Sequence, residues 1–191
     1  MLLLVPVIIA LLAALWRGGS PRNLATLPIR GSGYLVAALA IQIMLYLPPL
    51  RGSQAVSRWG GVIYVGALGL ALIGAWHNRR LGLAIRLATL GVVLNTTVIA
   101  ANGGYMPADA AATRAVGGAA PAARHTNAAP VEYDNTREAT PATRLILLSD
   151  ILPVPVPGGF GNVCSAGDVL LALGVATLVY RATRRPYRED A

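Results

Sequence analysis

The chain of 191 residues contains no lysine, one cysteine and one phenylalanine, and only 13% of its residues are charged. Soluble domains carry about 25% charged residues, so a soluble globular fold is disfavoured. The single cysteine, Cys164, excludes an intramolecular disulfide and a metal site built from several cysteines. All 16 basic residues are arginines, against eight acids. They stand in short clusters without interleaved aromatic residues, so we expect no nucleic-acid partner.

Five apolar runs are long enough, or nearly so, to cross the roughly 30 Å of hydrocarbon in a bilayer. They cover residues 1–16, 33–47, 59–76, 81–101 and 161–180. We therefore predict a single all-α domain, a polytopic membrane bundle of about five transmembrane helices. The first run lacks a basic segment before it and a small-residue cleavage site after it, so we interpret it as a helix rather than a signal peptide.

The distribution of arginine predicts the orientation of these helices. If the chain starts outside, the short inner segments 17–32 and 77–86 and the C-terminal tail carry ten arginines. The short outer loop carries two, Arg51 and Arg58. Because cytoplasmic loops are enriched in positive charge, we predict an outer N-terminus and an inner C-terminus.

Residues 102–160 form the long outer loop of this topology. From 108 to 141 the sequence is rich in Ala, Thr and Pro without apolar periodicity, and we expect a mobile loop there. Residues 144–161 are apolar but too short to cross and are rich in proline. We predict an interfacial segment of one or two helical turns followed by extended chain that leads into the last helix.

Four uncharged polar residues lie inside the predicted spans, where polar groups are candidates for function. We expect Gln42 and Asn95 to form hydrogen bonds between helices, and Thr96 and Thr97 to bond to their own helix. No carboxylate or lysine lies in the middle of a span, which disfavours an ion-coupled pump.

At the end of the fourth run, Asn102-Gly103-Gly104 is typical of a helix stop, in which glycine adopts the left-handed conformation. The alternative is a functional one. The two glycines expose backbone groups beside Asn102, where a ligand or a lipid headgroup could bind.

Two acids in the outer region need an explanation. Ser165 followed by Asp168 predicts a capping box at the start of the last helix. Asp150 lies among leucines and isoleucines, so we expect a partner, with Arg144 or Arg51 as candidates. The two acids could also form a metal or catalytic pair, but no histidine with ligand spacing accompanies them. We therefore assign no catalytic, metal or cofactor-binding residue, and the sequence specifies no cofactor.

Several of these signals recur in a fixed order along the chain. They are Asn95, Asn102-Gly103-Gly104-x-Met106-Pro107, Asp150-Ile151-Leu152-Pro153-x-Pro155, Asn162-Val163 and Ser165-x-Gly167-Asp168. This order resembles a family of small bacterial membrane proteins, domain of unknown function 5317. The sequence departs from the family pattern at Ser149, where glycine is usual. The resemblance implies a multi-pass protein of the bacterial inner membrane and implies no activity.

Three functions are compatible with the sequence. The first is a non-enzymatic accessory or structural subunit that associates with other membrane subunits, supported by small-residue spacings such as Ala84 and Ala88. The second is a protein or enzyme that binds a lipid or hydrophobic small molecule at the outer leaflet through Asn102, Asp150 and Asp168. The third is a small carrier or channel. We favour the first, and we expect membrane lipids as partners in each case.

Overall fold

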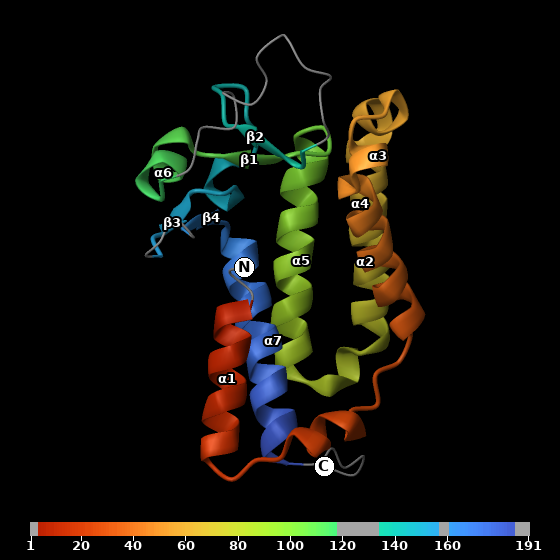
Figure 1. Ribbon diagram of the computed structural model, residues 1–191, viewed down its shortest axis with the longest axis vertical. Helices are drawn as coiled ribbons and strands as arrows, with labels where there is room; N and C mark the ends of the chain where they lie inside the picture. The colour runs from red at the N-terminus through yellow and green to blue at the C-terminus, as the bar shows by residue number, and fades with distance from the viewer. Residues whose placement is uncertain (1–3, 118–133, 157–160, 186–191) are drawn as a thin grey trace.

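Five apolar helices form an elongated bundle in the computed structural model, which describes residues 4–117, 134–156 and 161–185 (Figure 1). They are α1 (Leu4–Trp16), α2 (Ser32–Tyr46), α4 (Gln54–His77), α5 (Leu83–Ala101) and α7 (Ala166–Arg184). Successive helices run in opposite directions. By length and hydropathy α4, α5 and α7 can each cross a membrane, whereas α1 and α2 are apolar but shorter. The prediction of a mostly helical membrane protein is supported, and five crossings remain a prediction.

Local capping chemistry accounts for the differences between the predicted runs and the observed helices. The third helix starts at Gln54 rather than at residue 59, because the Ser53 hydroxyl accepts a hydrogen bond from Val56 N and caps it. The last helix starts at Ala166 rather than at residue 161, because the preceding residues form a strand. It also continues to Arg184 instead of ending at residue 180.

The helices pack in two groups that meet along α4 and α5. Helix α7 packs between α1 and α5, and α2 pairs with α4. The backbones of α5 and α7 approach closely at two levels: a Cβ built on Gly91 would lie 2.4 Å from Gly167 O, and one on Gly174 would lie 2.4 Å from Ala88 N. Ala84 and Ala88 are buried in this contact. Their predicted small-residue spacing therefore serves packing within the bundle.

Short helical turns connect the helices at both ends. They are η1 (Pro21–Thr26), α3 (Pro48–Arg51) and η2 (Arg79–Leu81). The η1 segment is held to the end of α7, because Ser20 N and Asn23 Nδ2 both donate to Thr183 O at 2.9 and 3.0 Å. Asn78, buried at the end of α4, donates to the carbonyls of Arg30 and Gly74 and accepts from Arg30 N. These bonds fix the relative positions of the helix ends.

The other end of the bundle is covered by a small folded layer, the cap, made of the described residues between 102 and 165. It contains β1 (Met106–Ala108), α6 (Ala110–Ala115), β2 (Thr136–Glu138), η4 (Ile146–Leu148), β3 (Leu152–Val154) and β4 (Asn162–Cys164). Strands β1 and β2 pair in parallel from Met106 opposite Thr136, and β3 and β4 pair antiparallel from Leu152 opposite Cys164. The purely helical fold class was therefore incomplete.

The cap also corrects the prediction of an unstructured outer segment. The described ends of the 108–141 region contain α6 and β2. Strand β2 is ordered by backbone hydrogen bonds to β1, which an analysis of apolar periodicity does not detect. Residues 118–133 lie outside the described part of the chain. The predicted helical turn and extended segment of 144–161 are confirmed as η4 and β3, with the extended part paired into a hairpin.

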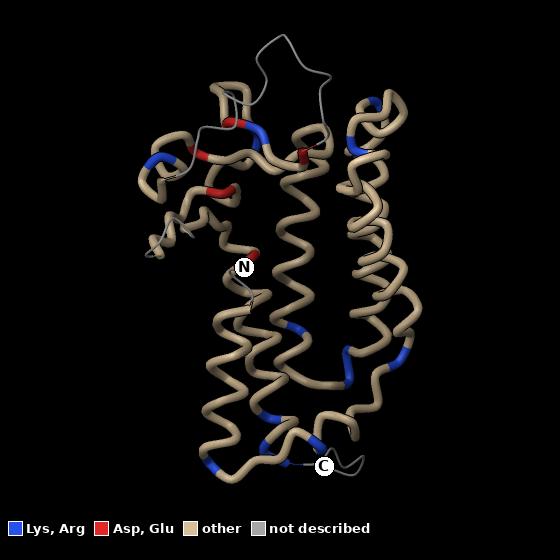
Figure 2. Tube along the Cα trace, viewed as in Figure 1, with Lys and Arg blue, Asp and Glu red and all other residues tan. Residues whose placement is uncertain are grey.

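Charge divides the bundle lengthwise. All acids of the described ranges lie at the cap end. Among the described residues, the only charged side chains at the opposite end are arginines (Figure 2). We call this opposite end the arginine end. Its charges come from the two connectors between helices, from the start of α5 and from the end of α7.

Candidate functional site

The cap is attached to α5 by the helix stop that the sequence predicts. Gly104 N donates to Ile99 O at 2.8 Å and Gly103, with φ of +72°, is left-handed, which together form a Schellman motif. The Asn102 side chain then pairs with the backbone of Arg144, donating to its carbonyl and accepting from its N–H, both at 2.9 Å. Asn102 therefore positions the chain ahead of η4, and its polar groups are occupied by the protein.

A polar cluster lies where α5, α7 and the cap meet. The Asn95 amide donates to Asp168 Oδ1 at 2.7 Å, and the Ser165 hydroxyl donates to Asn95 Oδ1 at 2.8 Å. The predicted capping box is confirmed: Asp168 N donates to Ser165 Oγ, and Ser165 N donates to Asp168 Oδ2. The hydrogen bond predicted for Asn95 between helices is confirmed too. This network links two residues of α7's first turn to the middle of α5.

Asp150 lies in the cap beside this cluster and is held through its backbone. Asp150 N donates to Pro107 O, and Asp150 O accepts from Asp109 N, both at 2.9 Å. The preceding residue, Ser149, is fully buried. The carboxylate oxygen Oδ1 is buried as well and has no hydrogen-bond partner in the described part of the chain. A buried carboxylate in this state is costly, because nothing replaces the water it loses.

The electrostatics of Asp150 differ from the prediction of an arginine partner. Neither Arg144 nor Arg51 makes an ion pair with it in the described ranges. Burial, and after it the negative charge of Asp168, raise the pKa of the Asp150 carboxyl from 3.8 to about 7. Asp150 is therefore a carboxyl near its protonation midpoint at neutral pH, next to a second carboxylate.

Two residues near Asp150 and Asp168, Tyr64 and Asn135, were not identified from the sequence. The Asn135 amide, ahead of β2, donates to the Tyr64 hydroxyl of α4 at 3.1 Å, and Asn135 O accepts from Met106 N. Tyr64 lies within electrostatic range of Asp168 and Asp150. The only sequence signal for Tyr64 is a hydroxyl in an apolar run, and its partner is 71 residues away along the chain.

Other predicted positions have local roles or lie elsewhere. Thr96 and Thr97 donate to carbonyls four residues earlier in α5, as predicted. The side chain of Gln42 makes no hydrogen bond within the described ranges, so the bond predicted for it between helices stays a prediction. Asn162 accepts from the neighbouring Val163 N in β4. It therefore joins the hairpin and not the polar cluster.

The cluster does not resemble a nucleophilic or metal centre. Cys164 is buried, and burial followed by the charges of Asp168 and Asp150 raises the pKa of its thiol, which disfavours the reactive thiolate. Within the described ranges, no three His, Cys, Asp or Glu residues lie close enough to hold a metal ion. The chemistry available there is hydrogen bonding and charge, centred on the Asp150 carboxylate.

Residues 26–180 match the model of a family of unknown function, DUF5317. The matched range includes α2, α4, α5 and the whole cap. Comparisons with curated proteins and with solved structures found no match.

Proposed function

This chain belongs to the family of unknown function DUF5317, and we propose that it is a five-span protein of the bacterial inner membrane that acts by binding. Its cap faces outward and its arginine end faces the cytoplasm. The concentration of arginine on the connectors at one end supports this orientation, because such connectors are retained inside. The shorter α1 and α2 pack against α7 and α4, which themselves have the length to span.

Cysteine labelling tests the orientation. In a Cys164→Ala background, a membrane-impermeant maleimide added to intact cells is expected to label Leu147→Cys in the cap, because Leu147 is 78% exposed. Arg22→Cys in η1 is exposed at the opposite end and is expected to react only after the membrane is permeabilised. The reverse pattern would overturn the orientation, and labelling of both positions in intact cells would overturn the five-span topology.

The proposed activity is that of an accessory subunit whose cap contacts another membrane subunit. The single observation that carries this proposal is the buried, unpartnered Oδ1 of Asp150. A cationic or N–H donor group of a partner that reached this oxygen would supply the hydrogen bond it lacks. The desolvation free energy of the carboxylate would then be offset, which favours binding at this position. The neighbouring carboxylate of Asp168 favours a cation over a neutral donor.

A second candidate is an outer-leaflet lipid or hydrophobic small molecule with an amino group. The observation that favours it is an exposed apolar edge just before Asp150, formed by Leu145, Ile146 and Leu147 around η4. An apolar body could lie on this edge while its amino group reaches the carboxylate. Both candidates require the same residue and differ in the chemical nature of the bound molecule.

Purification in mild detergent followed by native mass spectrometry tests both candidates. We expect wild-type protein to carry a stoichiometric partner that Asp150→Asn loses. Asp109→Asn is the matched control, since Asp109 caps α6 in the same layer through its own side chain. A lost protein supports the accessory role, and a lost lipid or small molecule supports the second candidate. Identical contents in wild type and Asp150→Asn would overturn both.

A further inference from the structure

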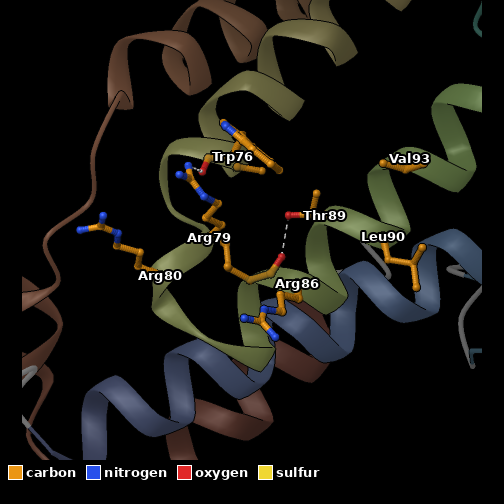
Figure 3. Close-up of a pocket in the computed structure, with 9 residues that line it drawn as sticks. Trp76, Arg79, Arg80, Arg86, Thr89, Leu90 and Val93 are labelled. Atoms are coloured by element: carbon orange, nitrogen blue, oxygen red, sulfur yellow. Dashed lines mark hydrogen bonds between the residues drawn. The ribbon is translucent and has the colours of Figure 1, made fainter. Parts of the chain in front are cut away.

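A pocket of about 530 Å³ opens at the arginine end of the bundle, far from the cap (Figure 3). It lies between the end of α4 and the start of α5. Its polar lining comes from Arg79, Arg80 and Arg86, and its apolar lining includes Trp76, Leu90 and Val93. The pocket therefore combines concentrated positive charge with an apolar wall.

No acid of the described ranges neutralises these arginines. In the described ranges, the side chains of Arg80 and Arg86 make no ion pair or hydrogen bond, and every acid lies at the opposite end of the bundle (Figure 2). Arg79 donates to Trp76 O at 3.0 Å, and its guanidinium lies 4.5 Å from the Trp76 ring centroid. Those contacts orient Arg79 while its remaining N–H groups stay available for an anion.

The apolar wall extends away from the arginines along α5. Arg86 is followed on the same helix by Leu90 and Val93, both of which are more than one-third exposed. At 1.5 Å per residue, the step from Arg86 to Val93 spans about 10 Å along the helix axis. Thr89 adds no polar group to the wall, because its hydroxyl donates to Ile85 O within the helix. A compact hydrated anion would leave this wall uncovered.

We propose that this pocket binds an anionic phospholipid of the cytoplasmic leaflet. The phosphodiester lies between Arg79 and Arg86, and one acyl chain lies along Leu90 and Val93. Trp76 lies at the level of the headgroup, where tryptophan is enriched in membrane proteins. Basic pockets between helices on the cytoplasmic side have the charge and the depth that such lipids require. This site is separate from the cap and does not depend on Asp150.

The same helix carries an internal reference for a test. Arg58 lies 5.5 Å from the Trp59 ring at the cap end of α4, so it repeats the arginine and tryptophan pair in the absence of the pocket. Two variants that each retain one tryptophan of the three, Trp76 or Trp59, therefore report on two ends of one helix. Acyl chains brominated near the headgroup quench tryptophan fluorescence on contact.

We would reconstitute both single-tryptophan proteins in phosphatidylcholine bilayers containing a low fraction of brominated phosphatidylglycerol, or of brominated phosphatidylcholine. Quenching of Trp76 is expected to require several-fold less brominated phosphatidylglycerol than brominated phosphatidylcholine, with nearly equal amounts for Trp59. Arg79→Gln with Arg86→Gln is expected to abolish the preference at Trp76, because each arginine near the membrane surface is worth about fivefold in binding an anionic lipid. Arg58→Gln should leave that preference unchanged.

Equal quenching of Trp76 by the two lipids would overturn the proposal, as would a preference that survives the double substitution. Loss of the preference on adding millimolar inorganic phosphate would assign the site to a soluble anion and overturn the lipid. If the double variant does not fold, the comparison of Trp76 with Trp59 in otherwise unaltered protein still decides the question. The cap experiment is independent, because Asp150→Asn leaves the pocket residues in place.

Discussion

Replacement of Asp150 by asparagine is expected to raise the melting temperature of the protein, and to raise it more at pH 8 than at pH 5. The Asp150 carboxyl has a pKa of about 7 in the folded protein against 3.8 when exposed. The folded state therefore holds a proton that the unfolded chain releases, and stability falls as pH rises from about 4 to about 7. Asparagine resembles the protonated acid and does not titrate.

The size of this effect follows from the raised pKa. Each unit corresponds to about 1.4 kcal/mol, so wild type loses roughly 3 kcal/mol between pH 5 and pH 8 through Asp150. Thermal melts at one scan rate, from pH 5 to pH 8, measure the slope on protein that a harsher detergent has freed of any bound partner. A variant that melts lower than wild type at pH 8 in this state would contradict the raised pKa of Asp150.

Asp168→Asn is the matched comparison, because it makes the same chemical change a few residues into α7. Both Asp168 oxygens accept hydrogen bonds, from Asn95 Nδ2 and from Ser165 N. An amide can accept only one of them and directs its own N–H₂ at the other donor. We expect a loss of about 1–2 kcal/mol at every pH. This exceeds the cost of a cap alone, because the carboxylate also holds α5.

The features that sequence predicted well are those encoded within a few residues. The capping box needs only Ser165 and Asp168, and the helix stop needs only Asn102 and the two glycines after it. In both cases the side chain or backbone satisfies helix-terminal groups that would otherwise lack partners, whatever the rest of the fold does. Such motifs can be predicted without knowledge of the tertiary structure.

The environment of Asp150 could not be predicted from the sequence, because it depends on contacts between distant segments. Its backbone is fixed by Pro107 and Asp109, more than 40 residues earlier, and the cap then buries its side chain. Apolar neighbours in sequence suggested an ion pair that would offset desolvation. The structure instead brings a second carboxylate nearby, through the crossing of α5 and α7. An ion pair would make Asp150→Asn destabilising, whereas the unpaired carboxylate makes the substitution stabilising.

Gly91→Ala is expected to disrupt the contact between α5 and α7. A Cβ at Gly91 would lie 2.4 Å from Gly167 O and 2.6 Å from Leu171 N. Both are backbone atoms of α7, so no side chain can rotate away and the two helices must separate. Because Asn95 lies one turn further along α5, separation also stretches its bond to Asp168. We expect loss of the folded monomer on size-exclusion chromatography, or a melting temperature at least 10 °C lower.

Gly69→Ala provides the control for the chemistry of the substitution. Gly69 lies inside α4, and a Cβ there meets no atom within 4 Å. Alanine is the better helix former by about 1 kcal/mol, so this variant is expected to be as stable as wild type or slightly more stable. Gly167→Ala should reproduce the Gly91→Ala defect from the opposite helix, since its Cβ would collide with the Asn95 amide oxygen and approach Gly91 O at 2.8 Å. If Gly91→Ala and Gly167→Ala both melt like Gly69→Ala, the backbones of α5 and α7 do not approach closely. The polar cluster at their crossing would then need a different geometry.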